Sequence, residues 1–331
     1  MLTAILVLGG LGLVGGIGLV VASRVFYVEV DPRIDKINDV LPGANCGGCG
    51  YPGCRGYAEA VVKGKAKMSD CAPGGTEAVD GIAAILGVEA EKVEPRVAVV
   101  RCSGDQDRGK EKFIYDGIAD CRSAHRIGGG HKICPSGCLG LGTCSAVCSF
   151  DAVVITDRRI AVIDAAKCTG CGNCVEACPR DLIGLYPESH KVHILCSNRE
   201  KGARVKKYCS CGCIACKLCA KESEHIKMDG LIALVTTESI PEDAPIPEEA
   251  SLICTPGVIL DERHYGHVAW ATDPAVRDDF KTRAKAMKKK RKAERDAKKK
   301  AKAEAKAAKA PDEKKPDEKK DDEKPAGEDG K

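Results

Sequence analysis

The spacing of the cysteines between residues 168 and 179 constrains this chain more than any other feature. The stretch reads CTGCGNCVEACP, which is C-x2-C-x2-C-x3-C followed by Pro179. Three thiolates on so short a loop bind one [4Fe–4S] cluster, and the fourth binds the neighbouring cluster. The pattern therefore predicts two adjacent clusters, with zinc as the alternative metal.

The number of cysteines supports metal ligation rather than disulfides. The 331 residues include 21 cysteines. Small secreted domains that rely on disulfides are much shorter and carry a secretory signal. We therefore expect a reducing compartment and thiolate ligands.

A second group of cysteines lies upstream in a looser pattern, C-x3-C-x5-C-x3-C. Exchange of the last ligand of each group predicts two clusters. The first is expected on Cys134, Cys138, Cys144 and Cys178. The second is expected on Cys148, Cys168, Cys171 and Cys174. Alternation between residues 152 and 164 predicts a β-hairpin that turns at Asp157 and Arg158.

The N-terminal cysteines form a separate four-ligand set in the pattern C-x2-C-x4-C-x16-C. They are Cys46, Cys49, Cys54 and Cys71. Glycines between them allow tight turns close to the sulfurs. Apolar residues three and four apart in 76–86 predict a helix behind this site. A [4Fe–4S] cluster is the favoured occupant, and zinc is the alternative.

A third group of cysteines repeats the second with ligands missing. Residues 225–238 resemble 153–166, which predicts a second hairpin. Ser223 stands where Cys148 would be, and the proline-rich segment 241–252 replaces the tight run. We expect one cluster here rather than two. Its ligands would be Cys213, Cys216, Cys219 and Cys254. The alternative is a degenerate unit that binds zinc or nothing.

Five cysteines remain without a predicted role: Cys102, Cys121, Cys196, Cys209 and Cys211. Cys102-Ser103 and Cys196-Ser197 both follow short apolar runs, so these segments read as one unit present twice. Buried, inert thiols are expected, and a further cluster is the alternative.

The first 26 residues predict a membrane anchor. Residues 2–22 carry no charge and would span about 31 Å as a helix, enough to cross a hydrocarbon core. No basic residue precedes them, which disfavours a cleaved secretory signal. Arg24, Arg33 and Lys36 follow, so the positive-inside rule places the rest in the cytoplasm.

The formal GxGxxG at 10–15 lacks the strand and helix of a dinucleotide loop. Its glycines suit packing against other membrane helices, or simply contact lipid.

The charge is divided between the body and the tail. Residues 281–331 carry a net charge of +9, whereas the first 280 carry −5. The sequence of 281–309 favours a charged helix, and 310–331 is expected to be disordered. The basic stretch is expected to be a solvated helix, with anionic lipid or an acidic protein as alternative contacts.

The predicted fold class is α+β, arranged in six segments. They are a transmembrane anchor (1–26), a small helical four-cysteine domain (27–90), a connecting segment (91–132), a two-cluster ferredoxin domain (133–190), a degenerate ferredoxin-like domain (191–262) and a Lys/Ala-rich helix with a disordered tail (263–331). The ferredoxin-like domains are expected to combine a β-hairpin with short helices.

These motifs together resemble one known family. The glycine-rich anchor, CGGCGYPGC, GCLGLG and CTGCGNCVEACP are similar to the B subunits of Rnf-type ion-translocating ferredoxin:NAD oxidoreductase complexes, in their longer, clostridial-like form. The resemblance covers residues 1–260. This chain departs from the family at Ser223 and 241–252, and its tail has no counterpart.

The resemblance implies an electron-transfer subunit in the cytoplasmic membrane. Such a subunit would take electrons from soluble ferredoxin and relay them through three or four [4Fe–4S] clusters to membrane and peripheral partners. Ion transfer (Na⁺ or H⁺) and NAD reduction would belong to those partners, because we find no flavin, nicotinamide or Walker loop here. Nucleic acid is not an expected partner. The alternatives are a membrane-tethered donor that reduces a regulator or another oxidoreductase, and a zinc protein without redox activity.

Overall fold

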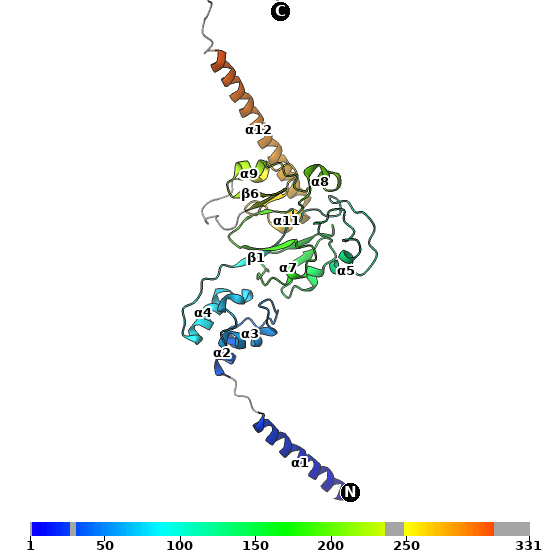
Figure 1. Cartoon of the computed structure of the whole chain (residues 1–331), viewed down its shortest axis with the longest axis vertical. Helices are drawn as coiled ribbons and strands as arrows, with labels where there is room; N and C mark the ends of the chain where they lie inside the picture. Colours follow the sequence, from blue (N-terminus) through cyan, green and yellow to red (C-terminus); the bar gives the residue numbers. More distant parts are fainter. Residues whose placement is uncertain (1, 27–30, 236–247, 308–331) are drawn as a thin grey trace, which may run out of the picture. The chain divides into compact units, whose positions relative to one another are not determined.

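A computed structural model describes residues 2–26, 31–235 and 248–307 (Figure 1). It is a mixture of helices and short strands. The chain divides into two units, Met1–Phe280 and Lys281–Lys331. The segment expected to be disordered (310–331) and most of the segment that replaces the tight cysteine run (241–247) lie outside the described residues.

The apolar N-terminus forms a single helix, α1 (Leu2–Val25). Its stretch Leu6–Val25 has a mean hydropathy of 2.2 and is long and apolar enough to cross a membrane. The formal GxGxxG lies inside this helix, so the backbone of a dinucleotide-binding loop is not formed there.

A small helical domain follows. Its helices and 3-10 turns are α2 (Pro32–Val40), α3 (Gly53–Val62), η1 (Met68–Asp70), η2 (Ala72–Gly74) and α4 (Gly75–Leu86). The predicted helix at 76–86 is therefore confirmed. Ile37, Tyr57 and Ile82 are almost completely buried between the helices. This core lies against the cysteines of the same domain.

The next part, here called the first repeat (residues 96–187), contains two pairs of antiparallel strands. The outer pair joins β1 (Arg96–Val100) to β4 (Ile183–Pro187), and the inner hairpin joins β2 (Val153–Ile155) to β3 (Ala161–Ile163). The hairpin lies where the alternation predicted it. Three short helices connect the strands: α5 (Cys121–Arg126), α6 (Thr143–Ala146) and α7 (Asn173–Ala177). Residues 91–132, expected as a connecting segment, thus supply β1 and α5.

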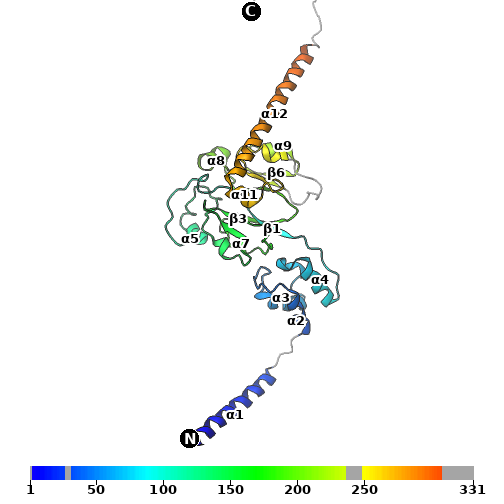
Figure 2. The same ribbon diagram turned by 180° about the vertical axis from the view of Figure 1, so that it is seen from behind.

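The second repeat (residues 192–261) has the same strand order. Its outer pair is β5 (Val192–Ile194) with β8 (Ile259–Asp261), and its hairpin is β6 (Ile226–Asp229) with β7 (Ile232–Val235). Its helices are α8 (Gly202–Tyr208), α9 (Leu218–Glu222) and α10 (Glu248–Leu252). In each repeat the first outer strand also touches the second hairpin strand, as Figure 2 shows for β1 and β3.

Two helices follow the second repeat, α11 (His267–Thr272) and α12 (Pro274–Ala307). Residues from 263 onward were expected to begin the tail. Instead α11 packs on β3, and Ala271 belongs to the core of the first repeat. Trp270 is 3% exposed, and its ring meets that of Phe280 edge-on at 4.9 Å. These apolar side chains explain why this segment packs against the body, whereas the lysine-rich remainder of α12 carries few such groups.

Candidate metal centres

The helical domain brings its four cysteines around one cavity. Cys46, Cys49, Cys54 and Cys71 line about 320 Å³ of empty space. The loop is held by Asn45, whose side-chain Oδ1 accepts a hydrogen bond from the Cys54 amide at 2.9 Å. Asn45 and Gly47 both have positive φ, and this backbone turns the loop around the cavity. The structure therefore brings this predicted ligand set together.

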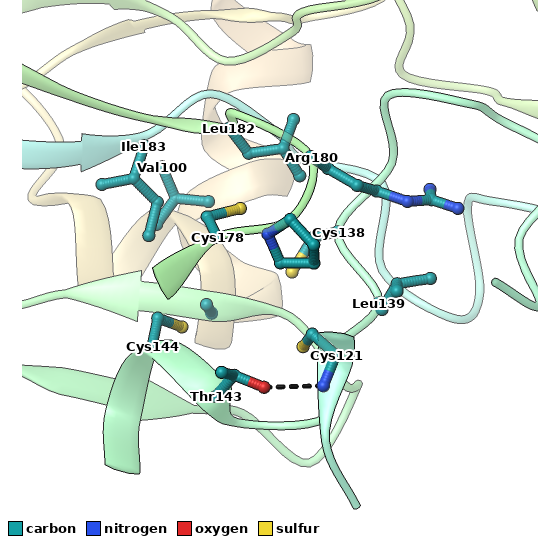
Figure 3. Close-up of a pocket in the computed structure, with 12 residues that line it drawn as sticks. Val100, Cys121, Cys138, Leu139, Thr143, Cys144, Cys178, Arg180, Leu182 and Ile183 are labelled. Carbon is teal, nitrogen blue, oxygen red and sulfur yellow. Dashed lines mark hydrogen bonds between the residues drawn. The ribbon is translucent and has the colours of Figure 1, made fainter. Parts of the chain in front are cut away.

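A second cavity, of about 370 Å³, lies in the first repeat (Figure 3). Four cysteines line it: Cys121, Cys138, Cys144 and Cys178. The predicted set contained Cys134 in place of Cys121. The structure places Cys134 outside this cavity, where the side-chain amide of Asn198 donates to its sulfur at 3.1 Å. Three of the four predicted residues therefore line this cavity, and the fourth cysteine that lines it is Cys121.

A capped helix end positions Cys121. Asp120 caps α5, because its carboxylate accepts from the Ser123 amide at 2.6 Å. Thr143 donates its hydroxyl to Asp120 at 2.8 Å and accepts from the Cys121 amide at 2.6 Å. Since Thr143 precedes Cys144, these bonds hold two cavity cysteines together. The sequence contains a signal that one ligand comes from outside the loop. Leu141 stands where a C-x2-C-x2-C loop has its middle cysteine, between Cys138 and Cys144.

The tight cysteine run forms the third set with Cys148. Burial, together with the charges of Cys168, Cys171 and Cys148, raises the pKa of Cys174 to about 12. The amide of Ala98 in β1 donates to the Cys168 sulfur at 3.3 Å. The predicted ligands of this cluster are therefore neighbours in the structure.

The second repeat contains the fourth set. Cys213, Cys216, Cys219 and Cys254 line about 360 Å³ of empty space. Burial raises the pKa of Cys254 to about 12 and that of Cys219 to about 11. The structure thus brings these four cysteines together, as the repeat predicted.

Three cysteine loops share one backbone conformation. The second and fourth residues after the first one of each loop have positive φ. They are Gly140 and Gly142, Gly170 and Gly172, and Ala215 and Lys217. Residues with side chains rarely adopt this conformation, so Ala215 and Lys217 are held there against their local preference. The shared geometry indicates that all three loops are shaped to surround the same kind of group.

The donor sets fit an iron–sulfur cluster better than a single ion. Zinc–sulfur bonds of about 2.3 Å would hold tetrahedral thiolates less than 4 Å apart. Within the described part of the chain, no three His, Cys, Asp or Glu side chains are arranged to bind a single ion. The three cavities instead have similar volumes and four thiols each. Burial raises the pKa values of five of these thiols, so cluster binding must displace protons from them. They are Cys71, Cys138, Cys144, Cys219 and Cys254.

Comparison with protein families supports the iron–sulfur assignment. A family model for an Fe-S cluster (FeS) matches residues 41–73, and a 4Fe-4S binding domain (Fer4) matches residues 161–183. The first range contains the whole N-terminal cysteine set, and the second contains the tight run. The chain therefore carries [4Fe–4S] binding domains.

Three curated relatives are named as the same component of related complexes. The B subunit of the Na⁺-translocating ferredoxin:NAD⁺ oxidoreductase complex of Acetobacterium woodii is 46% identical over 64% of this chain and 65% of its own length. The B subunit of the ion-translocating oxidoreductase complex of Methanosarcina acetivorans is 42% identical over 67% of this chain and 84% of its own. The proton-translocating counterpart of Clostridium ljungdahlii is 41% identical, over 61% and 72% respectively. The chain therefore belongs to the family of B subunits of Rnf-type ion-translocating oxidoreductase complexes, and it is an iron–sulfur subunit of such a complex.

Proposed function

We propose that this chain is the electron-entry arm of a membrane complex that couples ferredoxin oxidation and NAD reduction to ion translocation. The observation that carries the proposal is the presence of four separate four-cysteine sets on one chain with a membrane-competent helix. A [4Fe–4S] cluster supplies reversible one-electron transfer. The chain's own contribution is to hold the thiolates and to exclude water from them.

We assign sixteen cysteines as ligands, with one change from the sequence prediction. The first site is Cys46, Cys49, Cys54 and Cys71. The second is Cys121, Cys138, Cys144 and Cys178. The third is Cys148, Cys168, Cys171 and Cys174. The fourth is Cys213, Cys216, Cys219 and Cys254. The two repeats are proposed to be tandem ferredoxin-like units, which the matching strand order and cysteine loops support.

The first and third sites are proposed to exchange electrons directly. The side-chain amide of Asn173, which lies in the tight cysteine run, donates to the carbonyl oxygen of Cys46 at 2.8 Å. A Cβ on Gly48 would lie only 2.5 Å from the Cys171 carbonyl oxygen. A close backbone approach of this kind keeps two ligand loops together without an intervening side chain.

The donor is proposed to be an acidic soluble ferredoxin that docks on α8. Val205 and Tyr208 of this helix are buried, whereas Arg204, Lys206 and Lys207 are exposed. A Cβ on Gly202 would overlap the carbonyl oxygen of Ile214, which lines the fourth site, so this helix begins beside that site. Its basic face can accelerate the encounter with a redox partner of complementary charge. The positive residues after α1 favour a cytoplasmic location for this face.

Ion translocation is proposed to take place in partner subunits. The stretch from Leu2 to Ser23 in α1 contains no ionisable side chain, and intramembrane ion pathways are lined by such groups. The two relatives named for their coupling ion differ, one being Na⁺-translocating and the other proton-translocating. Family membership therefore does not determine the coupling ion, and we propose that the partner subunits determine it.

The test is an assay of ferredoxin:NAD oxidoreductase activity on the complex purified from membranes without oxygen. Charge reversal at Lys206 and Lys207 should raise the KM for ferredoxin, mainly at low salt, and leave kcat unchanged. A matched reversal of Lys298 and Lys299 in α12 should leave both constants unchanged. If the chain purifies from the membrane alone and reduces another acceptor, the tethered-donor alternative replaces this proposal.

A further inference from the structure

The two repeats meet through a pair of equivalent segments, each with a cysteine followed by a serine. The Ser103 hydroxyl donates to the Leu195 carbonyl at 3.4 Å. The Ser197 hydroxyl donates to the Arg101 carbonyl at 3.2 Å. Each serine therefore binds the residue that precedes the other cysteine. This reciprocal pairing buries Cys102 and Cys196 at the junction, outside the four sites described above.

A loop around Gly104 gathers more sulfur at this junction. A Cβ on Gly104 would lie 3.6 Å from the Cys209 sulfur and 3.7 Å from the Cys102 sulfur. Both sulfurs therefore border the same space, which is open because residue 104 is glycine. The sulfur of Cys211 lies 3.7 Å from that of Cys209. Three thiols thus converge on one point of the junction.

Backbone pairing fixes this arrangement. Gly109 and Cys209 form an antiparallel β-bridge. The Lys110 amide donates to the Tyr208 carbonyl at 2.8 Å, and the Ser210 amide donates to the Arg108 carbonyl at 3.0 Å. The loop of the first repeat is therefore joined to the cysteine segment of the second. These backbone hydrogen bonds fix the positions of the residues that carry the sulfurs.

Cys134 is the fourth thiol of this group. It is the cysteine that the structure places outside the second cavity. Arg180 donates to its carbonyl at 2.8 Å, and Asn198 donates to its sulfur at 3.1 Å. The same Asn198 amide also donates to the hydroxyl of Tyr208, the residue before Cys209, at 2.5 Å. Burial, and after it the charge of Cys102, raises the pKa of Cys134 to about 11. Cys134 therefore faces the same group of sulfurs.

A buried cation points to an anionic occupant. Lys132 is 2% exposed, and its ammonium group donates to the Gly104 carbonyl at 2.5 Å. Among the described residues, no carboxylate forms an ion pair with it. A buried ammonium group without an anion is strongly unfavourable. The negative charge that it requires is available from thiolates at the rim of the same loop.

We propose that Cys102, Cys134, Cys209 and Cys211 bind a fifth iron–sulfur cluster between the two repeats. The Cys138 amide donates to the Cys102 sulfur at 3.4 Å, so this site adjoins the second cluster site. Cys196 is not a ligand: its sulfur accepts from the Cys213 amide at 3.3 Å and lies toward the fourth site. The fifth site thereby connects the second and fourth sites. This role rests on the proposed electron-transfer function, but the site itself does not.

The test is the iron and acid-labile sulfide content of the full-length chain, purified without oxygen. The variant Cys209→Ser/Cys211→Ser should lose about four irons and four sulfides for a cubane, or about two of each for a [2Fe–2S] cluster. The matched variant Cys196→Ser should lose none. An unchanged iron content in the double variant, zinc in place of iron, or a loss on Cys196→Ser would each overturn the assignment.

A second variant gives a readout that does not depend on loss of ligands. Lys132→Met removes a buried positive charge, so the reduction potential of the fifth cluster should fall while the iron content stays constant. The affected EPR signal should be the one missing from the double variant. Unchanged potentials would contradict the proposal. Failure of the electron-transfer function would appear separately, as a wild-type complex that keeps its iron but has no ferredoxin:NAD oxidoreductase activity.

Discussion

The two repeats have one strand order but different numbers of ligand sets. In the first repeat α7 packs against α6 and β4, and in the second α10 packs against α9 and β8. Ser223 and Ala250 occupy the positions that correspond to Cys148 and Cys174, and both are buried. Ala250 instead joins a core with Ile226 and Ile259. The comparison teaches that apolar packing alone maintains this half of the repeat after its thiolates are lost.

The cysteine loops of the two repeats also differ: one keeps its ligands, and the other keeps its glycines. The second repeat keeps all three cysteines of its loop but places Ala215 and Lys217 where the other loops have glycine. The first repeat keeps the glycines of its 138–144 loop but has Leu141 in place of the middle cysteine. One repeat therefore retains ligands at the expense of backbone strain. The other retains the backbone and takes Cys121 from a distant helix.

The largest expected effect is loss of the cluster that the second repeat retains. Cys254→Ser should remove about four irons per chain, because one of the four thiolates of this site is lost. Iron and sulfide analysis measures this directly. Ser223→Ala is the matched control and should keep all the iron. An equal iron content in wild type and Cys254→Ser would mean that this cavity is empty.

Cys121 tests the first repeat in the same way. Cys121→Ser should remove about four irons, and adding Leu141→Cys should restore them by completing the loop. Leu141→Cys should not restore the iron lost from Cys134→Ser. Rescue of Cys134→Ser instead would return Cys134 to the second site, as the sequence first suggested.

Replacement of Gly170 should lower the stability of the protein. Gly170→Ala forces a side chain onto a residue with a φ of +69°, and its Cβ would overlap the Arg96 carbonyl. We expect a loss of about 3 kcal/mol in the free energy of unfolding. Denaturant unfolding measures it. Gly172→Ala, which has a positive φ but no close backbone contact, should cost less.

Acid should weaken the packing of α11, which begins with the buried His267. Burial lowers the pKa of His267 to about 4, from about 6.5 in an unfolded chain. The unfolded state therefore binds more protons as the pH falls, and stability is lost from pH 6.5 down to 4. Between pH 6.5 and 5 the loss is about 2 kcal/mol at this site. Urea unfolding of wild type and His267→Leu should show a smaller pH dependence in the variant.

The smallest expected effect is a gain. Ala215→Gly should stabilise the second repeat by roughly 0.5–1 kcal/mol, because glycine adopts the left-handed conformation without steric cost. Ala220→Gly, inside α9, should instead destabilise by about 1 kcal/mol. Thermal unfolding of the two variants gives the comparison. If Ala215→Gly also destabilises, the loop is not strained in the loaded protein.

Much of the fold could be predicted because it follows from local patterns. The helix at 76–86, the hairpin at 153–163 and the apolar N-terminal helix depend on hydrophobic periodicity over a few residues. The outer strand pairs were not predicted, because β1 and β4 are separated by more than eighty residues. No short-range pattern shows which distant strand completes a pair, and this is why β1 was assigned to a connecting segment. The packing of α11 on β3 is equally non-local, so α11 was assigned to the tail.

The sequence by itself determined the chemistry: thiolate spacing on short loops specifies iron–sulfur ligands, and motif order specifies the family. Only the tertiary structure decided which thiols share a cavity. The spacing predicted Cys134 as a ligand and left Cys121 without a role, but a capped helix directs Cys121 into the second cavity. Cys134 is held at the junction of the repeats by Asn198. Spacing fixes ligands on the same loop, whereas the packing of separate elements selects the last ligand.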